Sequence, residues 1–289
     1  MRPSAGVQNH ATRTCVALPR SIRLTFARPV VATPTLAIVL YVCIPVYNEA
    51  PTIGVLLWRL RSTFQEYARE YEVIVYDDSS TDATAETLEP YTRVLPLSVM
   101  RSEQRVGYAA SMDALLRETA SRTRYPRRDA IITMQADFTD QPEHIPDLVK
   151  RFEGGADVVV GEQELAESSP MEVRRLRRVA PWVLRPFVKV PGVSDPFGSF
   201  RLYRVSVIRD LITRAGNEPL VSASGWAGNV ELLLSAAKVA RRVETVQLAA
   251  RYDLRPRDSR VRPVADALNL FRFGRQARRV QRAEPQGTS

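Results

Sequence analysis

Cysteine and histidine are scarce in this chain, with two of each in 289 residues. Cys15 and Cys43 lack the spacing of zinc ligands and form no disulfide framework, which is consistent with a reducing cytoplasm. Cys43 lies in an apolar run, where a small inert thiol is expected. His10 and His144 are too few for a multi-histidine metal centre. These counts therefore exclude a structural zinc site and a histidine-based metal site.

Long hydrophobic runs are also missing. The apolar stretch from Val30 to Val46 is interrupted by Pro34 and ends in a polar turn. A bilayer-spanning helix needs roughly 20 apolar residues, so this stretch is too short, and no later segment does better. We therefore expect a cytoplasmic protein whose contact with a membrane, where there is one, is peripheral and at the cytoplasmic face.

Acidic residues are absent before Glu49, although this stretch contains five arginines. It is rich in Ser, Thr, Pro and Ala and has little hydrophobic periodicity. We interpret residues 1–39 as a disordered basic arm. A targeting peptide would have a similar composition, but there is no clear apolar core followed by a small-residue cleavage site. A mis-chosen start codon explains the arm equally well.

The composition is that of a globular protein, with 45% apolar and 25% charged residues. The length is sufficient for a sizeable core. The net charge is +9 and the pI is about 9.9. Such a charge favours anionic partners, namely phosphates, nucleic acid or an anionic lipid surface. The positive charge alone does not indicate which of these partners the protein binds.

Strands and helices alternate from Leu40 onward. The apolar positions from Ile53 to Tyr67 lie on one face of a helix, and Ser80 is placed to cap the helix that starts at Thr81. The expected strands cover residues 40–45, 71–78, 93–100, 129–137 and 156–161, and the expected helices 51–70, 81–88, a segment opening near 107, and 142–152. Apolar strands alternating with helices predict an α/β fold with a mostly parallel sheet and helices on both faces.

Carboxylates follow two of these strands. Asp77 and Asp78 end one apolar strand, and Asp137 ends the strand that starts at Ala130. Ligands of open parallel sheets bind beyond the carboxyl ends of the strands, so these acids are placed to bind a nucleotide or its metal ion.

Six segments resemble the motifs of family 2 glycosyltransferases of the GT-A fold. Cys43 to Glu49 (C-I-P-V-Y-N-E) and Val75 to Asp82 (V-Y-D-D-S-S-T-D) are similar to the opening P-x-Y-N-E and V-D-D-x-S-x-D. Residues 129–145 are similar to the family's D-x-D strand and the P-E-x-I-P that follows it. Residues 195–201, 225–232 and 255–260 are similar, in that order, to D-x-x-S-G-F-R, G-F-x-x-x-x-E-L and R-x-x-G-x-S-K. The last resembles an element of dolichol-phosphate mannose synthases and related polyprenyl-phosphate glycosyltransferases.

This resemblance implies a GT-A domain with a Rossmann-like sheet over residues 40–262. It also implies inverting transfer of a mannose- or glucose-type hexose from a nucleotide-diphosphate sugar to polyprenyl phosphate. Within the pair of acids, Asp78 is expected to contact the ribose side of the nucleotide and Asp77 to brace the loop. The residues expected to bind the nucleotide sugar are Pro45, Tyr47, Glu49, Asp77, Asp78, Gln135, Ala136, Arg255, Arg257 and Arg260.

The metal-binding motif departs from the family pattern. It reads Gln135-Ala136-Asp137, so one of the two usual carboxylates is a neutral amide. Asp137 is then the principal ligand and a catalytic residue. Because Mg²⁺ commonly binds through one or two carboxylates and substrate phosphates, Mg²⁺ or Mn²⁺ is still the expected cofactor.

On the acceptor side, the resemblance implicates Arg178, Ser199 and Arg201, and it makes Glu231 the candidate general base. Each of these charged residues also has an alternative interpretation without a role in the reaction. The arginine run that ends at Arg178 is also typical of a solvent-exposed helix face. Arg201 could instead be a surface charge at a sheet edge, and Glu231 a structural carboxylate that is paired inside the protein.

Residues 263–289 are expected to form a basic C-terminal helix and tail. Apolar residues there precede a cluster of arginines, which suits an anionic membrane surface holding a lipid phosphate acceptor. An ordinary helix packed on the sheet is the alternative. Two other functions remain open, namely transfer to a hydroxyl of a glycan or lipid and a non-catalytic nucleotide-sugar-binding module. Nucleic acid is not expected as a partner, because the arginine-rich ends lack interleaved aromatics.

Overall fold

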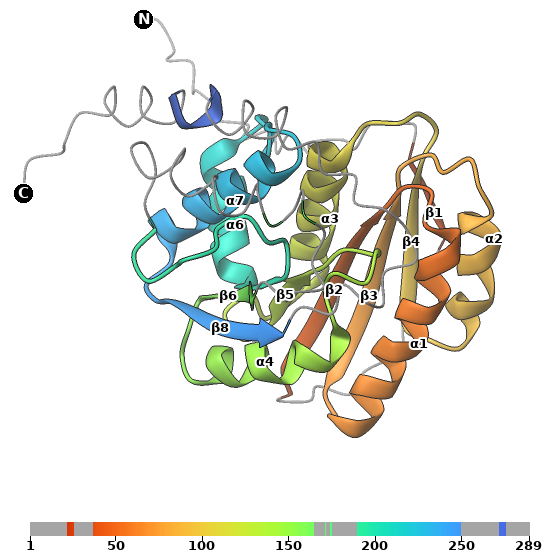
Figure 1. The fold of residues 1–289 in the computed structure, drawn as a ribbon, viewed down its shortest axis with the longest axis horizontal. Coiled ribbons are helices and arrows are strands. Elements are labelled where there is room, and N and C mark those ends of the chain that lie inside the picture. The colour runs from red at the N-terminus through yellow and green to blue at the C-terminus, as the bar shows by residue number, and fades with distance from the viewer. Residues whose placement is uncertain are drawn as a thin grey trace, which may run out of the picture.

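A single sheet organises the molecule in the computed structural model, which describes residues 22–25, 37–164, 171, 174, 190–249 and 272–275. Its eight described strands lie in the order β1-β4-β3-β2-β5-β7-β6-β8 (Figure 1). The strands are β1 Ile22–Thr25, β2 Val39–Val46, β3 Glu70–Asp77, β4 Leu97–Ser102, β5 Ala130–Thr133, β6 Val158–Glu164, β7 Arg201–Arg204 and β8 Val243–Ala249. The predicted α/β class and mostly parallel sheet are confirmed.

The direction of the strands fixes where their ends meet. Strands β2 to β5 are parallel neighbours, whereas β7 runs antiparallel between β5 and β6. In the register, Arg201 at the start of β7 lies opposite both Thr133 and Val160. The start of β7 and the ends of β2 to β6 therefore lie along one edge, which we call the carboxyl edge.

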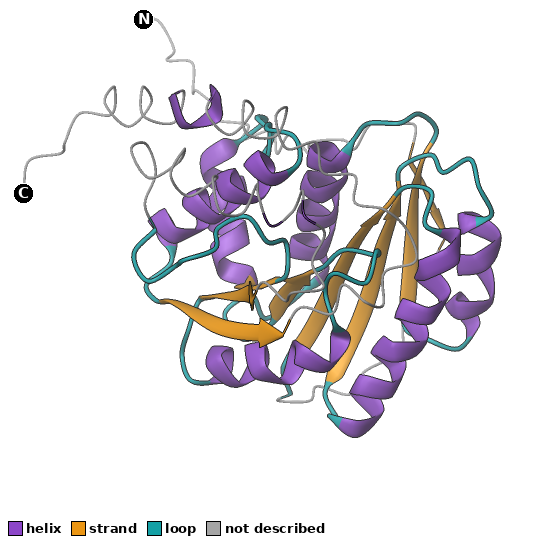
Figure 2. Cartoon of the chain, in the orientation of Figure 1, coloured by secondary structure: helices purple, strands orange, loops and turns teal. Residues whose placement is uncertain are grey.

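Helices cover both faces of the sheet (Figure 2). The helices are α1 Ala50–Glu66, α2 Thr84–Leu88, α3 Tyr108–Arg122, α4 Ile145–Glu153, α6 Val205–Ala215 and α7 Trp226–Val239, with two 3₁₀ turns, η1 Glu89–Arg93 and η2 Pro142–His144. Residues of α1, α2 and α4 join one apolar core with one face of the strands. Residues of α3, α6 and α7 join a second core on the opposite face. Both predicted helical layers are thus present.

The central strands are apolar on both faces because both are covered. In β2, Leu40, Val42 and Ile44 point into one core, and Tyr41 and Cys43 into the other. Cys43 is fully buried with its sulfur 3.2 Å from Thr119 Oγ1, and burial raises its thiol pKa to about 12. The prediction of an inert structural thiol is confirmed.

Several local predictions were wrong. The strand expected from residue 93 begins at Leu97, and the helix expected to end at residue 70 ends at Glu66. Strand β5 ends at Thr133 rather than at Asp137, because Gln135 N–H turns back to bond the carboxylate of Asp140 instead of a strand neighbour. Ser80 does not cap α2, which begins at Thr84; its hydroxyl accepts from the N–H of Asn48.

The predicted disordered arm is also contradicted at Ile22–Thr25. These four residues form β1, which pairs antiparallel with β4 at the edge of the sheet. Residues 1–21 and 26–36 of the arm, and most of the predicted C-terminal helix, lie outside the described residues; within that helix, residues 272–275 are helical. No described helix is both long and apolar enough to cross a membrane.

Candidate active site

The expected site residues gather at the carboxyl edge in two groups. The β2–β5 half contains Tyr47, Asp78, Arg105 and the loop of residues 135–140 that follows β5. The β6–α7 half contains residues 162–163 at the end of β6, the segment 194–201 that leads into β7, and the first turn of α7. The two groups belong to successive parts of the chain and meet where β5 and β7 pair.

The loop after β2 is held in a defined shape. Asn48 has a positive φ of 54°, and its side-chain oxygen accepts from the N–H of Thr81 at 2.8 Å. Pro45 lies within β2, opposite Tyr76, so the strand continues one residue beyond it. Glu49 is buried, and its carboxylate accepts from the hydroxyl of Thr52 at 3.0 Å. This loop therefore presents Tyr47 from a rigid support.

Arg105 covers the ring of Tyr47. Its guanidinium carbon lies 3.9 Å from the ring centroid, a cation–π contact between the β4–α3 loop and the β2–α1 loop. A flat aromatic ring next to an exposed guanidinium suits a nucleotide base and its phosphates. Sequence reasoning missed Arg105; the available signal was a cation two residues before Gly107, where α3 opens.

Asp77 and Asp78 both brace backbone. The carboxylate of Asp78 accepts from the N–H groups of Val106 at 2.6 Å and Gly107 at 2.9 Å, which fixes the loop that carries Arg105. Asp77 accepts from Ser80 N–H at 2.9 Å. Its other oxygen lies 3.4 Å from Nε of Arg101. The brace assigned to Asp77 fits these contacts, and the ribose contact assigned to Asp78 stays a prediction.

Asp137 lies in a strained loop beyond β5. It is buried, and its carboxylate accepts from both N–H and Oγ1 of Thr139, at 3.1 and 2.5 Å. The next residue, Phe138, has a φ of +63°, which is unfavourable for a bulky side chain. The Phe138 ring is buried in a core of the protein, and its carbonyl accepts from the side chain of Gln141. Core packing therefore sustains the strained backbone beside Asp137.

Asp140 accepts several of the hydrogen bonds that hold this loop, and it was not among the site residues predicted from the motifs. Its carboxylate accepts from Gln135 N–H at 2.8 Å, from Ser199 Oγ at 3.0 Å and from Gln163 Nε2 at 3.0 Å. The same Gln163 nitrogen donates to the carbonyl of Thr139 at 2.8 Å. Ser199, expected on the acceptor side, thus bonds to the loop that bears Asp137.

Arg201 is inside the protein, not at a surface edge. Its side chain is 1% exposed because β7 lies between β5 and β6. The guanidinium donates to the carbonyls of Pro196 (2.6 Å) and Asn229 and to the hydroxyl of Tyr203 (3.2 Å). Its Nε has no hydrogen-bond partner among the described residues. The surface-charge alternative for Arg201 is wrong.

Asn229 joins the β6–α7 half to α3. Its side chain donates to Phe197 O at 2.9 Å and accepts from the hydroxyl of Tyr108 at 2.6 Å. Burial raises the pKa of Tyr108, which keeps this phenol protonated as a donor. Trp226, at the start of α7, stacks on Phe197 with ring centroids 5.5 Å apart. Asn229 was also missed, although it lies inside the segment that resembles G-F-x-x-x-x-E-L.

Glu231 and Glu162 hold loops in place. Glu231 accepts from Ser222 N–H and Oγ, both at 2.7 Å, and from Ala223 N–H at 2.8 Å. Buried Glu162 accepts from the N–H groups of Ser194 and Asp195. The contacts of Glu231 fit the structural alternative, and its role as general base stays a prediction.

In the Gln135-Ala136-Asp137 motif, only Asp137 offers a carboxylate to a metal ion. Among the described residues, no three His, Cys, Asp or Glu side chains are grouped as a metal-binding cluster. The donor set fits a cation held by Asp137 with substrate phosphates and water, since Mg²⁺ sites often use only one or two carboxylates. Arg178, Arg255, Arg257 and Arg260 lie outside the described residues.

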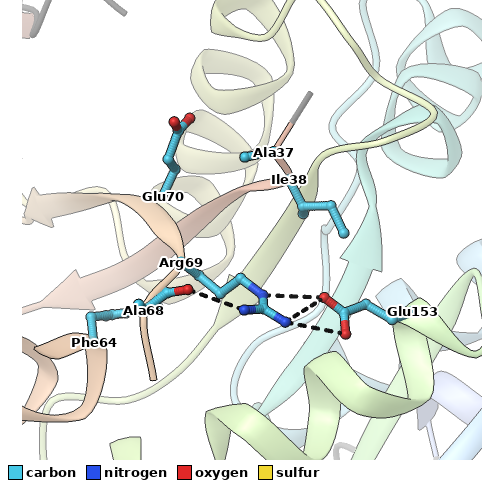
Figure 3. A pocket seen from close by; sticks show the side chains of 7 residues that line it. All are labelled: Ala37, Ile38, Phe64, Ala68, Arg69, Glu70 and Glu153. Atoms are coloured by element: carbon cyan, nitrogen blue, oxygen red, sulfur yellow. Dashed lines mark hydrogen bonds and ion pairs between the residues drawn. The ribbon is translucent and has the colours of Figure 1, made fainter. Parts of the chain in front are cut away.

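A pocket of about 620 Å³ lies at the opposite edge of the sheet, where β2 and β3 begin (Figure 3). Two of its charged groups pair with each other: Arg69 lies 3.1 Å from Glu153, and it also donates to the carbonyl of Ala68 at 3.1 Å. None of the expected site residues lines it. The pocket is therefore separate from the candidate active site.

The sequence of the chain is similar to those of known proteins. The family model described as Glycosyl transferase family 2 matches residues 41–212. Dodecaprenyl-phosphate galacturonate synthase from Rhizobium johnstonii is 28% identical over 184 residues, which cover 62% of this chain and 51% of that protein. Dolichol-phosphate mannosyltransferase from Pyrococcus furiosus is 27% identical over 172 residues, covering 58% and 46%. The chain thus spans about half the length of these curated relatives.

Solved structures confirm the GT-A fold. Mannosyl-3-phosphoglycerate synthase from Rubrobacter xylanophilus superposes with a TM-score of 0.58 at 15% identity, covering 87% of this chain and 77% of that one. Glucosyl-3-phosphoglycerate synthase from Mycobacterium tuberculosis, in complex with Mn²⁺, UDP and its product, gives a TM-score of 0.53 at 21% identity, covering 83% and 77%. At these identities the likeness shows the fold alone.

Proposed function

The chain belongs to glycosyl transferase family 2, and from this premise we propose that it transfers a hexose from a nucleotide-diphosphate sugar to polyprenyl phosphate. The observation that carries the donor assignment is the joint placement of the Tyr47–Arg105 stack and the Asp137 loop at the carboxyl edge. The lipid phosphate assignment is supported by the relatives, whose names specify dodecaprenyl phosphate and dolichol phosphate.

In this proposal the β2–β5 half binds the donor. Tyr47 and Arg105 hold the base, and Asp78 contacts the ribose while it fixes the loop that carries Arg105. Asp137 holds Mg²⁺ or Mn²⁺ against the diphosphate, and the cation offsets the charge that develops on the leaving nucleoside diphosphate. Gln135 and Ala136 belong to this loop and contact the nucleotide sugar, and Arg255, Arg257 and Arg260 bind the diphosphate.

The acceptor attacks from the β6–α7 half. In an inverting transfer, an acceptor oxygen attacks the anomeric carbon in line as the nucleoside diphosphate leaves. A phosphate acceptor is already an anion at pH 7 and needs no general base. Arg178 and Arg201 supply positive charge on this side, and the arginines beyond residue 255 hold an anionic membrane surface.

A second acceptor class is favoured by one observation. The donors of Ser199, Arg201 and Gln163 bond inside the protein, to Asp140, to main-chain carbonyls and to Tyr203. A hydroxyl acceptor on a glycan or lipid needs less positive charge, and Glu231 then serves as the general base.

A donor and acceptor panel tests both versions. UDP- and GDP-linked hexoses are incubated with polyprenyl phosphate or with glycan and glycolipid acceptors, with Mn²⁺ or with EDTA. Transfer to polyprenyl phosphate supports the proposal, and transfer only to hydroxyl acceptors supports the second version. Nucleotide binding without transfer to any acceptor or to water would leave a non-catalytic binding module.

Membrane association is tested separately by sedimentation with vesicles. Each basic residue near an anionic surface contributes about 1 kcal/mol at moderate salt. We expect pelleting with anionic vesicles at low salt and little at high salt. Equal pelleting with neutral vesicles, or none with either kind, contradicts the electrostatic attachment.

A further inference from the structure

Asp140 connects three parts of the active site through one buried carboxylate. The side chain is 2% exposed. One oxygen accepts from Gln135 N–H and from Ser199 Oγ, at 2.8 and 3.0 Å. The other accepts from Gln163 Nε2 at 3.0 Å. Asp140 thus closes the loop of residues 135–140 on itself and ties it to the end of β6 and the segment before β7.

The loop needs such restraints because its backbone is strained. Phe138 at φ +63° occupies a region that is unfavourable for a bulky residue and persists only where the surroundings over-determine it. The restraints lie on both sides of Asp137: Asp140 holds Gln135 N–H before it, and Gln163, itself bonded to Asp140, holds Thr139 O after it. Asp140 contributes to both restraints.

We propose that Asp140 is the positioning residue of this site: it holds the loop in the strained form that presents Asp137 to a nucleotide-bound cation, and it joins that loop to Ser199 in the β6–α7 half. The inference rests on the proposed function, since it takes Asp137 as the ligand of that cation. Asp140 itself acts through the loop and not as a ligand, because its oxygens face Gln135, Ser199 and Gln163.

A carboxylate is required here because donors meet both of its oxygens. Asparagine has one acceptor oxygen, which would replace the oxygen that faces Gln135 N–H and Ser199 Oγ. Its NH₂ group would then face the Nε2 donor of Gln163. Gln163 must turn its side-chain oxygen toward that NH₂ group and release the carbonyl of Thr139. Asp140→Asn thus loosens the loop while it keeps the side-chain volume.

The test separates metal binding from nucleotide binding. Electron paramagnetic resonance of Mn²⁺ measures its affinity in the presence of UDP or GDP, and calorimetry with EDTA measures nucleotide affinity without metal. Changes behind metal ligands commonly cost 10–100-fold in metal affinity, so we expect a loss of about that size in Asp140→Asn. Nucleotide affinity in EDTA should stay at the wild-type value, because Tyr47, Asp78 and Arg105 are unchanged.

Asp157→Asn is the matched control. Asp157 is a buried aspartate that also accepts three hydrogen bonds, from Arg204 and Arg241, but it lies where β6 begins, away from the carboxyl edge. We expect it to lower the thermal midpoint without changing Mn²⁺ affinity. An equal loss of Mn²⁺ affinity in both variants would mean general destabilisation and overturn the inference.

If Asp140→Asn does not fold, Mn²⁺ affinity in Ser199→Ala and Gln163→Ala tests the same inference. Each removes one outer contact of Asp140 and should lower Mn²⁺ affinity by less than Asp140→Asn does. The double variant Asp140→Asn with Gln163→Ala should lose no more than Asp140→Asn alone, since both act through the contact between Asp140 and Gln163. Wild-type protein that binds neither nucleotide with Mn²⁺ overturns the proposed function and this inference together. Mn²⁺ affinity that stays at the wild-type value in the folded variants overturns the inference alone.

Discussion

At the scale of single residues, the acids of the carboxyl edge mostly bind the protein's own backbone. Asp77 and Asp140 each accept from a main-chain N–H group of their own loop, and Asp78 accepts from two N–H groups of the β4–α3 loop. A carboxylate does this strongly because it accepts hydrogen bonds with a full negative charge. Substitution of these residues therefore changes the shape of the site as well as its charge, and a useful experiment has to measure the two effects separately.

Asp137→Asn should abolish transfer while the protein still folds. The amide oxygen can still accept from Thr139, so the loop keeps its shape, but the only carboxylate of the Gln135-Ala136-Asp137 motif is lost. Gln135→Asp restores the second acid and should tighten Mn²⁺. Turnover, Mn²⁺ affinity and the thermal midpoint are measured together. Near-normal turnover in Asp137→Asn would contradict the donor-site assignment.

Arg105→Ala should weaken nucleotide binding. A cation–π contact contributes about 0.5–2 kcal/mol, so we expect the dissociation constant of UDP or GDP to rise between about 2- and 30-fold. Arg105→Lys keeps the charge but not the planar group that stacks on Tyr47, and its effect should be intermediate. Calorimetry in EDTA removes any contribution of the metal. Tighter binding in Arg105→Ala would mean that the guanidinium competes with the base for Tyr47.

At the scale of elements, the hydrophobic pattern of the sequence predicted the helices and strands whose positions depend on residues nearby in the chain. The apolar face of α1 and the apolar runs of β2 and β3 were placed within a few residues, because burial on both sides of the sheet requires those side chains. The end of β5 could not be predicted, since it depends on a bond from Gln135 to Asp140. The direction of β7, and with it the burial of Arg201, follows from pairing with β5 and β6, which are distant in sequence.

Removal of β1 should destabilise the protein modestly. A variant that starts at Ala27 loses the four residues that pair with β4, whereas a control that starts at Ser21 keeps them. For a domain of this size, 1 kcal/mol corresponds to about 2–4 °C, and the lost ladder predicts a drop of a few degrees. The bared edge of β4 should also promote aggregation. Identical thermal midpoints and solubility in the two truncations would show that β1 contributes nothing.

At the scale of the whole molecule, Asp157 ties three strands together and makes stability depend on pH. Burial disfavours its charge, but hydrogen bonds from Arg241 and Arg204 lower its pKa below the ordinary value of 3.8. Its contribution is therefore complete above about pH 4 and is lost as the pH falls below 3.8. Urea unfolding at several pH values should show a shallower acid decline in Asp157→Asn than in the wild type. Parallel declines would contradict this role.

The order of the two halves along the chain has a consequence for how such enzymes diversify. Everything in the β2–β5 half precedes residue 141, and the described part of the β6–α7 half lies between residues 162 and 231, so one exchange near the Gly154–Gly155 turn separates them. Described side-chain contacts that cross that boundary within the site join Asp140 to Ser199 and Gln163, and Tyr108 to Asn229, while others, such as the Arg151–Glu244 ion pair, cross it elsewhere. Under the proposed function, recombination between relatives that match at the crossing contacts would give a chimaera with the donor specificity of one parent and the acceptor specificity of the other. Acceptor specificity can therefore change in evolution independently of donor specificity where those contacts are kept.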